Sequence, residues 1–206
     1  MSTSPTSERV IGIDPGSIRC GVGIVERDRG RLVHIWSETI ECGRGDFPER
    51  LETIYGRIHH LCELYQPTRA GIEGIFHYRN ADSALKLGHA RGVAMLALRH
   101  ANLDIQEYQP GEVKKTVGSY GAAAKEQVRA MVMRLLSLDE APGLDASDAL
   151  AIAITAAWRR ELTTASAARR SPLQEAIARH AKPQTSSGFQ QRVNEAIARA
   201  DARRTR

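Results

Sequence analysis

Short apolar runs alternate with turn residues over the first third of the chain, a pattern that predicts β-strands. Three runs rich in Val and Ile, over residues 9–14, 21–27 and 32–41, are separated by short segments that contain Gly or Arg. Strand-length runs joined by short turns are typical of an antiparallel meander. We therefore expect a three-stranded antiparallel unit, preceded by a disordered lead-in over residues 1–8.

The middle of the chain changes to a helical period. Ile54, Ile58 and Leu61 share one apolar stripe of a helix expected over residues 47–65, and Pro67 ends it. The remaining pattern predicts two short strands, over residues 70–75 and 104–108, and four helices, over residues 80–101, 112–117, 125–136 and 145–160. Such an order of elements predicts a mixed α/β sheet with helices on its faces.

After residue 160 the composition shifts to Ala, Arg and Ser, and the net charge of the 206-residue chain lies there. Residues 161–206 carry nine Lys or Arg and four Asp or Glu, which accounts for the whole excess of +5. A basic terminal block serves as a nucleic-acid arm in some proteins and as a solubilising segment in others, and both remain open. We predict one domain over residues 9–160 and a basic, flexible C-terminal tail over residues 161–206.

Cysteine and hydropathy patterns exclude several classes of protein. Cys20, Cys42 and Cys62 have no C-x-x-C spacing, so neither a disulfide framework nor a cysteine zinc site is indicated. The longest apolar stretch near the end, residues 149–158, is far shorter than the ~20 residues that span a bilayer. Residues 1–8 lack the apolar core of a signal peptide. We expect a cytoplasmic protein without a membrane segment.

Two carboxylates occur where apolar strands are expected. Asp14 ends the first run, directly before Pro15 and Gly16, so it is either held at the margin of the sheet or is part of a turn signal. Glu73 interrupts the apolar run over residues 70–76. A buried charge must be paired or bound to a metal, so Glu73 is either such a group or faces water from an edge strand.

Two further carboxylates open the last predicted helix. Asp145 and Asp148 are three residues apart, so both side chains project from one face. Capping of the helix and a favourable place in its dipole would explain one or both of them. The helix is otherwise rich in Ala and Ile on all sides, which indicates burial, and two acids on a buried first turn need a further reason.

Together these four acids lie on three separate elements, with no competing histidine or cysteine cluster. Ligation by carboxylate oxygens favours hard cations such as Mg²⁺ or Mn²⁺. Two such ions about 4 Å apart can activate water and stabilise the leaving oxygen in phosphodiester cleavage. The pattern therefore indicates metal-assisted phosphodiester hydrolysis.

The sequence resembles the RuvC family, the crossover junction endodeoxyribonucleases that resolve Holliday junctions. The resemblance extends over about residues 9–160, in order, and it is carried by residues 12–17, 72–76, 80–94, 113–117 and 145–153. It implies an α/β, RNase H-like fold with a mixed five-stranded sheet, in which an antiparallel three-strand meander is extended by parallel strands and helices lie on both faces. It also implies a homodimer that nicks two strands of a four-way DNA junction symmetrically.

The resemblance further implies how the reaction proceeds and where it acts. Asp14, Glu73, Asp145 and Asp148 match the family's catalytic, metal-binding acids, which hold two Mg²⁺ ions per active site, with Mn²⁺ able to substitute. The products would carry a 5′ phosphate and a 3′ hydroxyl. The expected context is homologous recombination and DNA repair, with the RuvA–RuvB branch-migration complex as partner.

Four residues are expected to contact DNA. Phe76 matches a family aromatic that contacts junction bases, and Lys114 and Lys125 match lysines near the DNA backbone. Arg79 follows Phe76 on the same loop, where interleaved aromatic and basic residues suit base stacking and phosphate contact. The chain departs from the family at Gly74, where Gln is common, and at residues 77–79, where small or aliphatic residues are usual.

Three other functions remain open from the residues alone. A different RNase H-like nuclease would share the fold and the acids. A junction-binding protein without catalysis would keep the fold only. Residues 13–17 followed by residues 21–25 also resemble the first phosphate hairpin of actin/hexokinase-type ATPases, although those proteins need two such domains and a longer chain.

Overall fold

The computed structural model describes residues 7–43, 45–74, 81–118 and 125–167. The chain divides into two compact units, Met1–Leu162 and Thr163–Arg206, and the first contains the whole β-sheet. Most of the predicted tail and most of the predicted lead-in lie outside the described residues. The division of the chain at residue 160 therefore stays a prediction.

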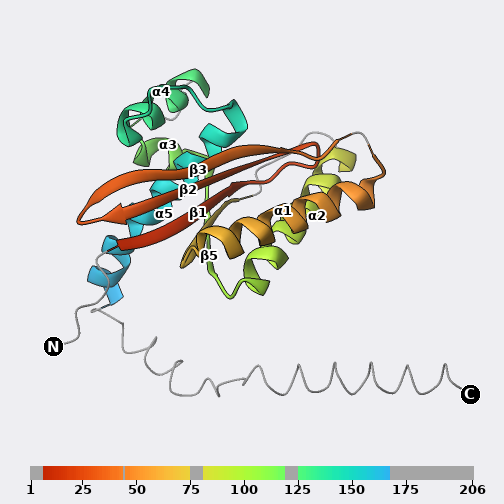
Figure 1. The fold of residues 1–206 in the computed structure, drawn as a ribbon, viewed down its shortest axis with the longest axis horizontal. Helices are drawn as coiled ribbons and strands as arrows, with labels where there is room; N and C mark the ends of the chain where they lie inside the picture. The colour runs from red at the N-terminus through yellow and green to blue at the C-terminus, as the bar shows by residue number, and fades with distance from the viewer. Residues whose placement is uncertain (1–6, 44, 75–80, 119–124, 168–206) are drawn as a thin grey trace, which may run out of the picture. The chain divides into compact units, whose positions relative to one another are not determined.

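The sheet has five strands in the order β3-β2-β1-β4-β5. Figure 1 shows β3, β2 and β1 side by side. The strands are β1 (Ser7–Asp14), β2 (Arg19–Asp28), β3 (Arg31–Glu41), β4 (Arg69–Glu73) and β5 (Asp104–Tyr108). β1, β2 and β3 form the predicted antiparallel meander, and β4 and β5 extend it in parallel. β1 begins two residues earlier than the pattern predicts because Ser7 and Glu8 pair with Asp28 and Arg27.

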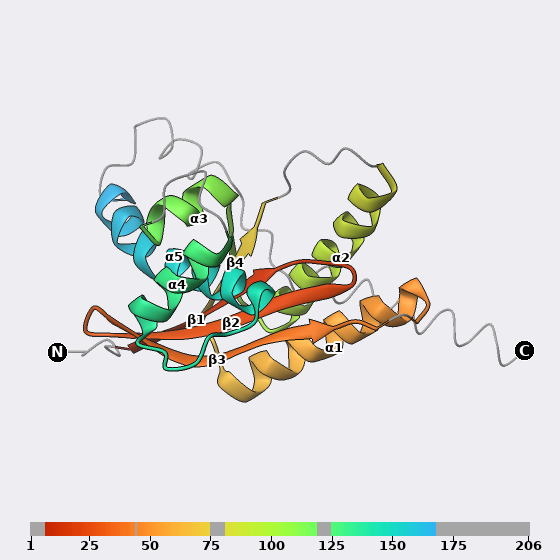
Figure 2. The ribbon, with the colours of Figure 1, turned by 90° about the horizontal axis from the view of Figure 1, so that it is seen from above.

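Helices cover both faces of the sheet (Figure 2). They are α1 (Phe47–Tyr65), α2 (Ala81–His100), α3 (Pro110–Thr116), α4 (Lys125–Leu136) and α5 (Leu144–Ala167). α3 begins two residues earlier than predicted because Pro110 takes the first helical position, where its missing N–H is not needed. Over the described residues, none of these helices combines the length and the apolarity needed to cross a membrane.

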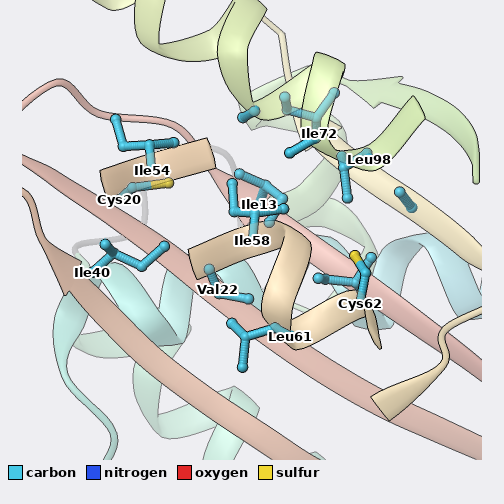
Figure 3. Close-up of a cluster of buried hydrophobic side chains, with 14 of the residues drawn as sticks. Ile13, Cys20, Val22, Ile40, Ile54, Ile58, Leu61, Cys62, Ile72 and Leu98 are labelled. Carbon is cyan, nitrogen blue, oxygen red and sulfur yellow. The ribbon is translucent and has the colours of Figure 1, made fainter. Parts of the chain in front are cut away.

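The face covered by α1 and α2 is packed with large branched side chains. Ile13 and Val22 of the sheet lie under Ile54, Ile58 and Leu61 of α1, and all five are fully buried (Figure 3). Burying one such side chain stabilises a protein by about 1.5–3 kcal/mol. This layer therefore supplies much of the apolar stabilisation of the fold.

The face covered by α5 is built on a different principle. Alternation along the strands turns Gly12, Gly21 and Gly23 to this side, opposite the buried isoleucines. A Cβ atom at Gly12 or Gly21 would overlap a backbone carbonyl oxygen of α5, and one at Gly23 would lie 2.6 Å from the backbone nitrogen of Leu150. The helix backbone thus rests directly on β1 and β2. The burial predicted for this helix is confirmed, since residues 149–157 are buried.

Candidate active site

Asp14 and Glu73 lie at neighbouring strand ends. β1 and β4 are parallel, and their register pairs Ile13 with Ile72, so the two acids come next on adjacent strands. Both isoleucines point into the α1 and α2 layer, so the acids that follow them project to the opposite face, under α5. β4 lies between β1 and β5, so the alternative in which Glu73 faces water from an edge strand is wrong.

Helix α5 brings the other two acids to the same edge of the sheet. Gly21 pairs with Asp14 across the β1–β2 ladder, and the carbonyl oxygen of Asp145 occupies the space where a Cβ of Gly21 would lie. Asp148 follows three residues later, on the same first turns of α5. Burial raises the pKa of the Cys20 thiol, and the negative charges of Asp14 and Asp145 raise it further. Both acids therefore lie close to this cysteine.

The four acids are all partly buried, and they come from three different elements. Asp145 forms an ion pair with Arg19, in which Oδ2 of Asp145 lies 3.4 Å from Nε of Arg19. Among the described residues, no group of three or more His, Cys, Asp or Glu side chains is arranged around a common metal position. The carboxylate chemistry and the shared face fit a hard divalent cation, whereas the side chains do not form a closed ligand shell.

Comparison with known proteins decides the family. The family model described as "Crossover junction endodeoxyribonuclease RuvC" matches residues 10–156. The chain belongs to the RuvC family. It is a nuclease of the Holliday junction resolvase family, and the resemblance drawn from the sequence motifs is confirmed. The same match covers the segment that resembles the ATPase hairpin, which removes the support for that alternative.

Individual relatives give the extent of the similarity. RuvC of Pseudomonas fluorescens is 49% identical over 152 residues, covering 73% of this chain and 87% of that protein. RuvC of Acinetobacter baumannii is 47% identical over 145 residues, covering 70% of this chain and 80% of that protein. These relatives belong to a family of metal-dependent nucleases.

Solved structures confirm the predicted fold class. Thermus thermophilus RuvC in complex with a Holliday junction substrate is 31% identical, with a TM-score of 0.68, and the match covers 76% of this chain and 97% of that chain. The yeast mitochondrial Holliday junction resolvase shares the fold at 16% identity, with a TM-score of 0.57 over 78% of this chain and 83% of that chain. The mixed five-stranded sheet with helices is the RuvC architecture.

One residue that contacts this edge of the sheet was missed by the sequence analysis. Arg91 of α2 donates from Nε to the carbonyl oxygen of Glu73 at 3.1 Å, and its Nη2 lies 2.7 Å from Oε2 of Glu107 on β5. Its side chain is only 12% exposed. Arg91 therefore fixes the end of the strand that carries Glu73. The available signal was a single arginine within the small-residue segment of the helix, between Ala90 and Gly92.

Lys114 lies on α3, which leaves the same edge of the sheet. The last residue of β5, Tyr108, pairs with Glu73, and α3 begins two residues later. The backbone N–H of Gln109 donates to Oε2 of Glu112 at 3.0 Å, and Glu112 also pairs with Arg159 of α5 at 2.8 Å. The helix that carries Lys114 is thus fixed at its start and against α5.

The side chains of the other predicted DNA contacts lie outside the described residues. Phe76 and Arg79 lie outside the described residues, as does the side chain of Lys125, whose backbone begins α4. Gly74, the departure from the family pattern, is described. A Cβ at Gly74 would lie 2.6 Å from Nε2 of Gln109, so the amide of Gln109 occupies the space beside it.

Proposed function

We propose that this protein resolves four-way DNA junctions by metal-dependent hydrolysis of one phosphodiester in each of two symmetrically placed strands. One observation carries the proposal: Asp14 and Glu73 end adjacent parallel strands and face α5, whose first turns carry Asp145 and Asp148. Membership of the RuvC family supports the choice of substrate, because a solved member is bound to a Holliday junction.

We assign all four acids to two Mg²⁺ ions, with Mn²⁺ able to substitute. Asp14 stands between the other groups, because Glu73 is beside it on β4 and Asp145 lies over its β2 partner, Gly21. From this position Asp14 would hold the ions together with Glu73 on one side and with Asp145 and Asp148 on the other. Bound ions of this kind supply an activated water and stabilise the departing oxygen. The products carry a 5′ phosphate and a 3′ hydroxyl.

The protein contributes position as well as charge. Arg91 holds the carbonyl of Glu73, and the glycines under α5 set the height of Asp145 above the sheet. We assign Lys114 and Lys125 to the DNA backbone, and Phe76 and Arg79 to bases and phosphates near the crossover. If Lys114 or Lys125 contacts a phosphate, its replacement should lower the slope of log affinity against log salt by about one.

Two symmetrical cuts require two active sites, which a homodimer provides. Helix α2 offers an apolar face for such a dimer, because Leu85 is 62% exposed and Leu96 is 48% exposed. Gly88 and Gly92 lie between them, in a shallow apolar hollow of about 510 Å³. Small residues flanked by leucines along one helix allow a second copy to approach closely. By family relationship, we also propose the RuvA–RuvB complex as partner and the cytoplasm as location.

The deciding experiment incubates the protein with a synthetic four-way junction and with linear duplex, each with and without Mg²⁺. We expect paired, symmetrically placed nicks in the junction alone and only with the metal. Asp14→Asn should reduce nicking by at least about 10³-fold and leave junction affinity within a few-fold, because it removes a metal ligand but little surface.

Other results would separate the alternatives. Junction binding with no nicking under any divalent metal would establish the non-catalytic alternative. Cutting of RNA or of a different branched DNA in preference to four-way junctions would indicate another RNase H-like nuclease. Wild-type nicking by Asp14→Asn would reject the assignment of the acids.

A further inference from the structure

A cavity of about 490 Å³ lies beside the proposed metal site. It is lined by the turn from Pro15 to Arg19, which directly follows Asp14, by the first turns of α1 and α2, and by Asp145 itself. This volume falls within the range of small-ligand sites in proteins. The cavity therefore adjoins the position where a strand would be cut, although none of its basic residues has been given a role above.

Basic side chains from three elements line this cavity. They are Arg19 of β2, Arg50 of α1 and Lys86 of α2. Lys86 is paired with Asp82 at 2.6 Å, and Arg19 is paired with Asp145 at 3.4 Å. Two of the three positive charges are thus matched by carboxylates in the cavity wall.

Arg50 differs from the other two. Within the described part of the chain it forms no ion pair, and its Nε is buried without a hydrogen-bond partner. Its guanidinium lies over the ring of Phe47, with Cζ 5.2 Å from the ring centroid. The aromatic contact fixes the side chain but does not neutralise it. A half-buried arginine without a carboxylate partner favours an anion, and its planar fork matches the oxygens of a phosphate.

We propose that this cavity binds a phosphate of the cleaved DNA strand, next to the phosphate that is cut, and that Arg50 is its main contact. The inference rests on the proposed function, because the strand must pass the acids for its neighbouring phosphate to reach the cavity. Asp145 borders both places, and the turn that lines the cavity begins one residue after Asp14. The cavity would thus hold the strand in register with the metal site.

The test neutralises one phosphate at a time. Synthetic junctions carry a single uncharged methylphosphonate at successive positions around the cut, and affinity is titrated without divalent metal, so that the strands stay intact. We expect the wild-type protein to lose about 3- to 10-fold in affinity at a position next to the cut. In Arg50→Gln the loss of affinity caused by the same methylphosphonate should shrink to less than 2-fold. The substitution and the methylphosphonate remove the same contact, so their effects are not additive.

The controls separate position from charge. Arg31→Gln removes the same kind of charge at the β2–β3 turn, roughly 30 Å along β2 from Arg19 at ~3.3 Å per residue, and it should keep the wild-type sensitivity. Arg50→Lys should keep most of the wild-type sensitivity to the methylphosphonate next to the cut. Arg50→Gln should also lower the salt slope of binding by about one, whereas Arg50→Lys should not. If Arg50→Gln unfolds, Arg50→Met takes its place, because its aliphatic chain retains the packing on Phe47.

The outcomes distinguish this inference from the function on which it rests. If the wild-type protein cuts junctions but Arg50→Gln and Arg31→Gln share every methylphosphonate sensitivity, the function stands and the phosphate site is rejected. If the wild-type protein neither binds nor cuts junctions, the proposed function fails and the phosphate site fails with it.

Discussion

The two faces of the sheet are packed in opposite ways. Under α1 the contact is made by large side chains, such as Ile13 of β1 against Ile58 of the helix. Under α5 the strands present glycines, and the helix backbone comes down onto them at Gly12 and Gly21. A layer of interlocking side chains can adjust by changing rotamers. A backbone resting on a backbone has no such freedom.

This difference matters because all four acids belong to the second face. Asp14 projects under α5, and the carbonyl of Asp145 rests on Gly21, the ladder partner of Asp14. The heights of the helix and of its acids are therefore set by atoms that cannot be rearranged. The first face supplies stability and the second supplies position, so substitutions on the two faces should have different consequences.

Among substitutions that compare the two faces, the largest effect is expected from Gly21→Ala. The new methyl group would overlap the carbonyl oxygen of Asp145, which is backbone and cannot move without lifting α5. We expect nicking to fall by more than about 100-fold, because an error of about 1 Å in catalytic geometry is enough for such a loss. Nicking under single-turnover conditions, normalised to folded protein by circular dichroism, measures it.

The matched control is Gly56→Ala on α1. A Cβ at Gly56 meets nothing within 4 Å, and alanine is favoured over glycine in a helix by about 0.5–1 kcal/mol. This variant should nick normally and melt slightly higher. If Gly21→Ala also nicked normally, the close approach of α5 would not control the site.

Leu61→Ala tests the first face. Leu61 is fully buried against the sheet, and removing its side chain leaves a cavity that costs about 2–5 kcal/mol. We expect a lower free energy of unfolding in urea, with nicking per folded molecule close to that of the wild type. A large loss of nicking at low temperature, where the variant is folded, would show that the two faces are coupled.

Arg91→Gln should have an intermediate effect. Arg91 lies on α2, but its side chain donates a hydrogen bond to the carbonyl oxygen of Glu73 at the end of β4. We expect about 10-fold slower nicking, with junction affinity within 2-fold of the wild type and a higher Mg²⁺ concentration at half-maximal rate. Arg99→Gln is the control, since Arg99 on the same helix donates to the carbonyl of Leu103 at 2.8 Å. Equal rates for both variants would assign Arg91 a structural role only.

The smallest effect concerns Glu38 of β3 and its pH dependence. The hydrogen bond from Arg57 of α1 is the main reason that the pKa of Glu38 is lowered. Because the pKa of Glu38 is lower in the folded state, its ion pair stabilises the protein fully at pH values above the unfolded-state pKa. This stabilisation is lost as the pH falls through the folded-state pKa. Glu38→Gln should therefore cost about 0.2–1 kcal/mol at pH 7.

Melting temperatures at two pH values provide the measurement for Glu38. The difference between Glu38→Gln and the wild type should be present at pH 7 and should shrink below the lowered pKa, where Glu38 is protonated in both states. A constant difference over the whole range would show that the carboxylate charge contributes nothing.

Local pattern predicted the type and order of the elements, and several of their bounds. The apolar stripe through Ile54, Ile58 and Leu61 predicted α1 with its observed bounds, Phe47–Tyr65. The residues of β5 were likewise predicted as observed, Asp104–Tyr108. Helix α5 runs to Ala167, beyond the predicted end at residue 160, because Ala, Leu and Thr continue there without a breaking residue. Periodicity and breakers act over a few residues, so the sequence carries them directly.

The site was predicted only in part. The acids could be chosen from the sequence because charged residues stand out in apolar segments. Arg91 and Arg50 could not, because their distinguishing feature is what lies near them. The partner of Arg91 is the carbonyl of Glu73, 18 residues away in sequence, and Arg50 is recognised by the absence of a carboxylate partner among the described residues.

The sequence by itself determined most of the strands and helices and the family motifs, and it singled out the four acids as candidates. Tertiary structure decided that β4 lies inside the sheet, so that Glu73 sits beside Asp14 rather than at an edge. It also decided that Gly21 lies under Asp145. Strand order and backbone contact between distant segments depend on the packing of the whole core, and no short stretch of sequence specifies that packing.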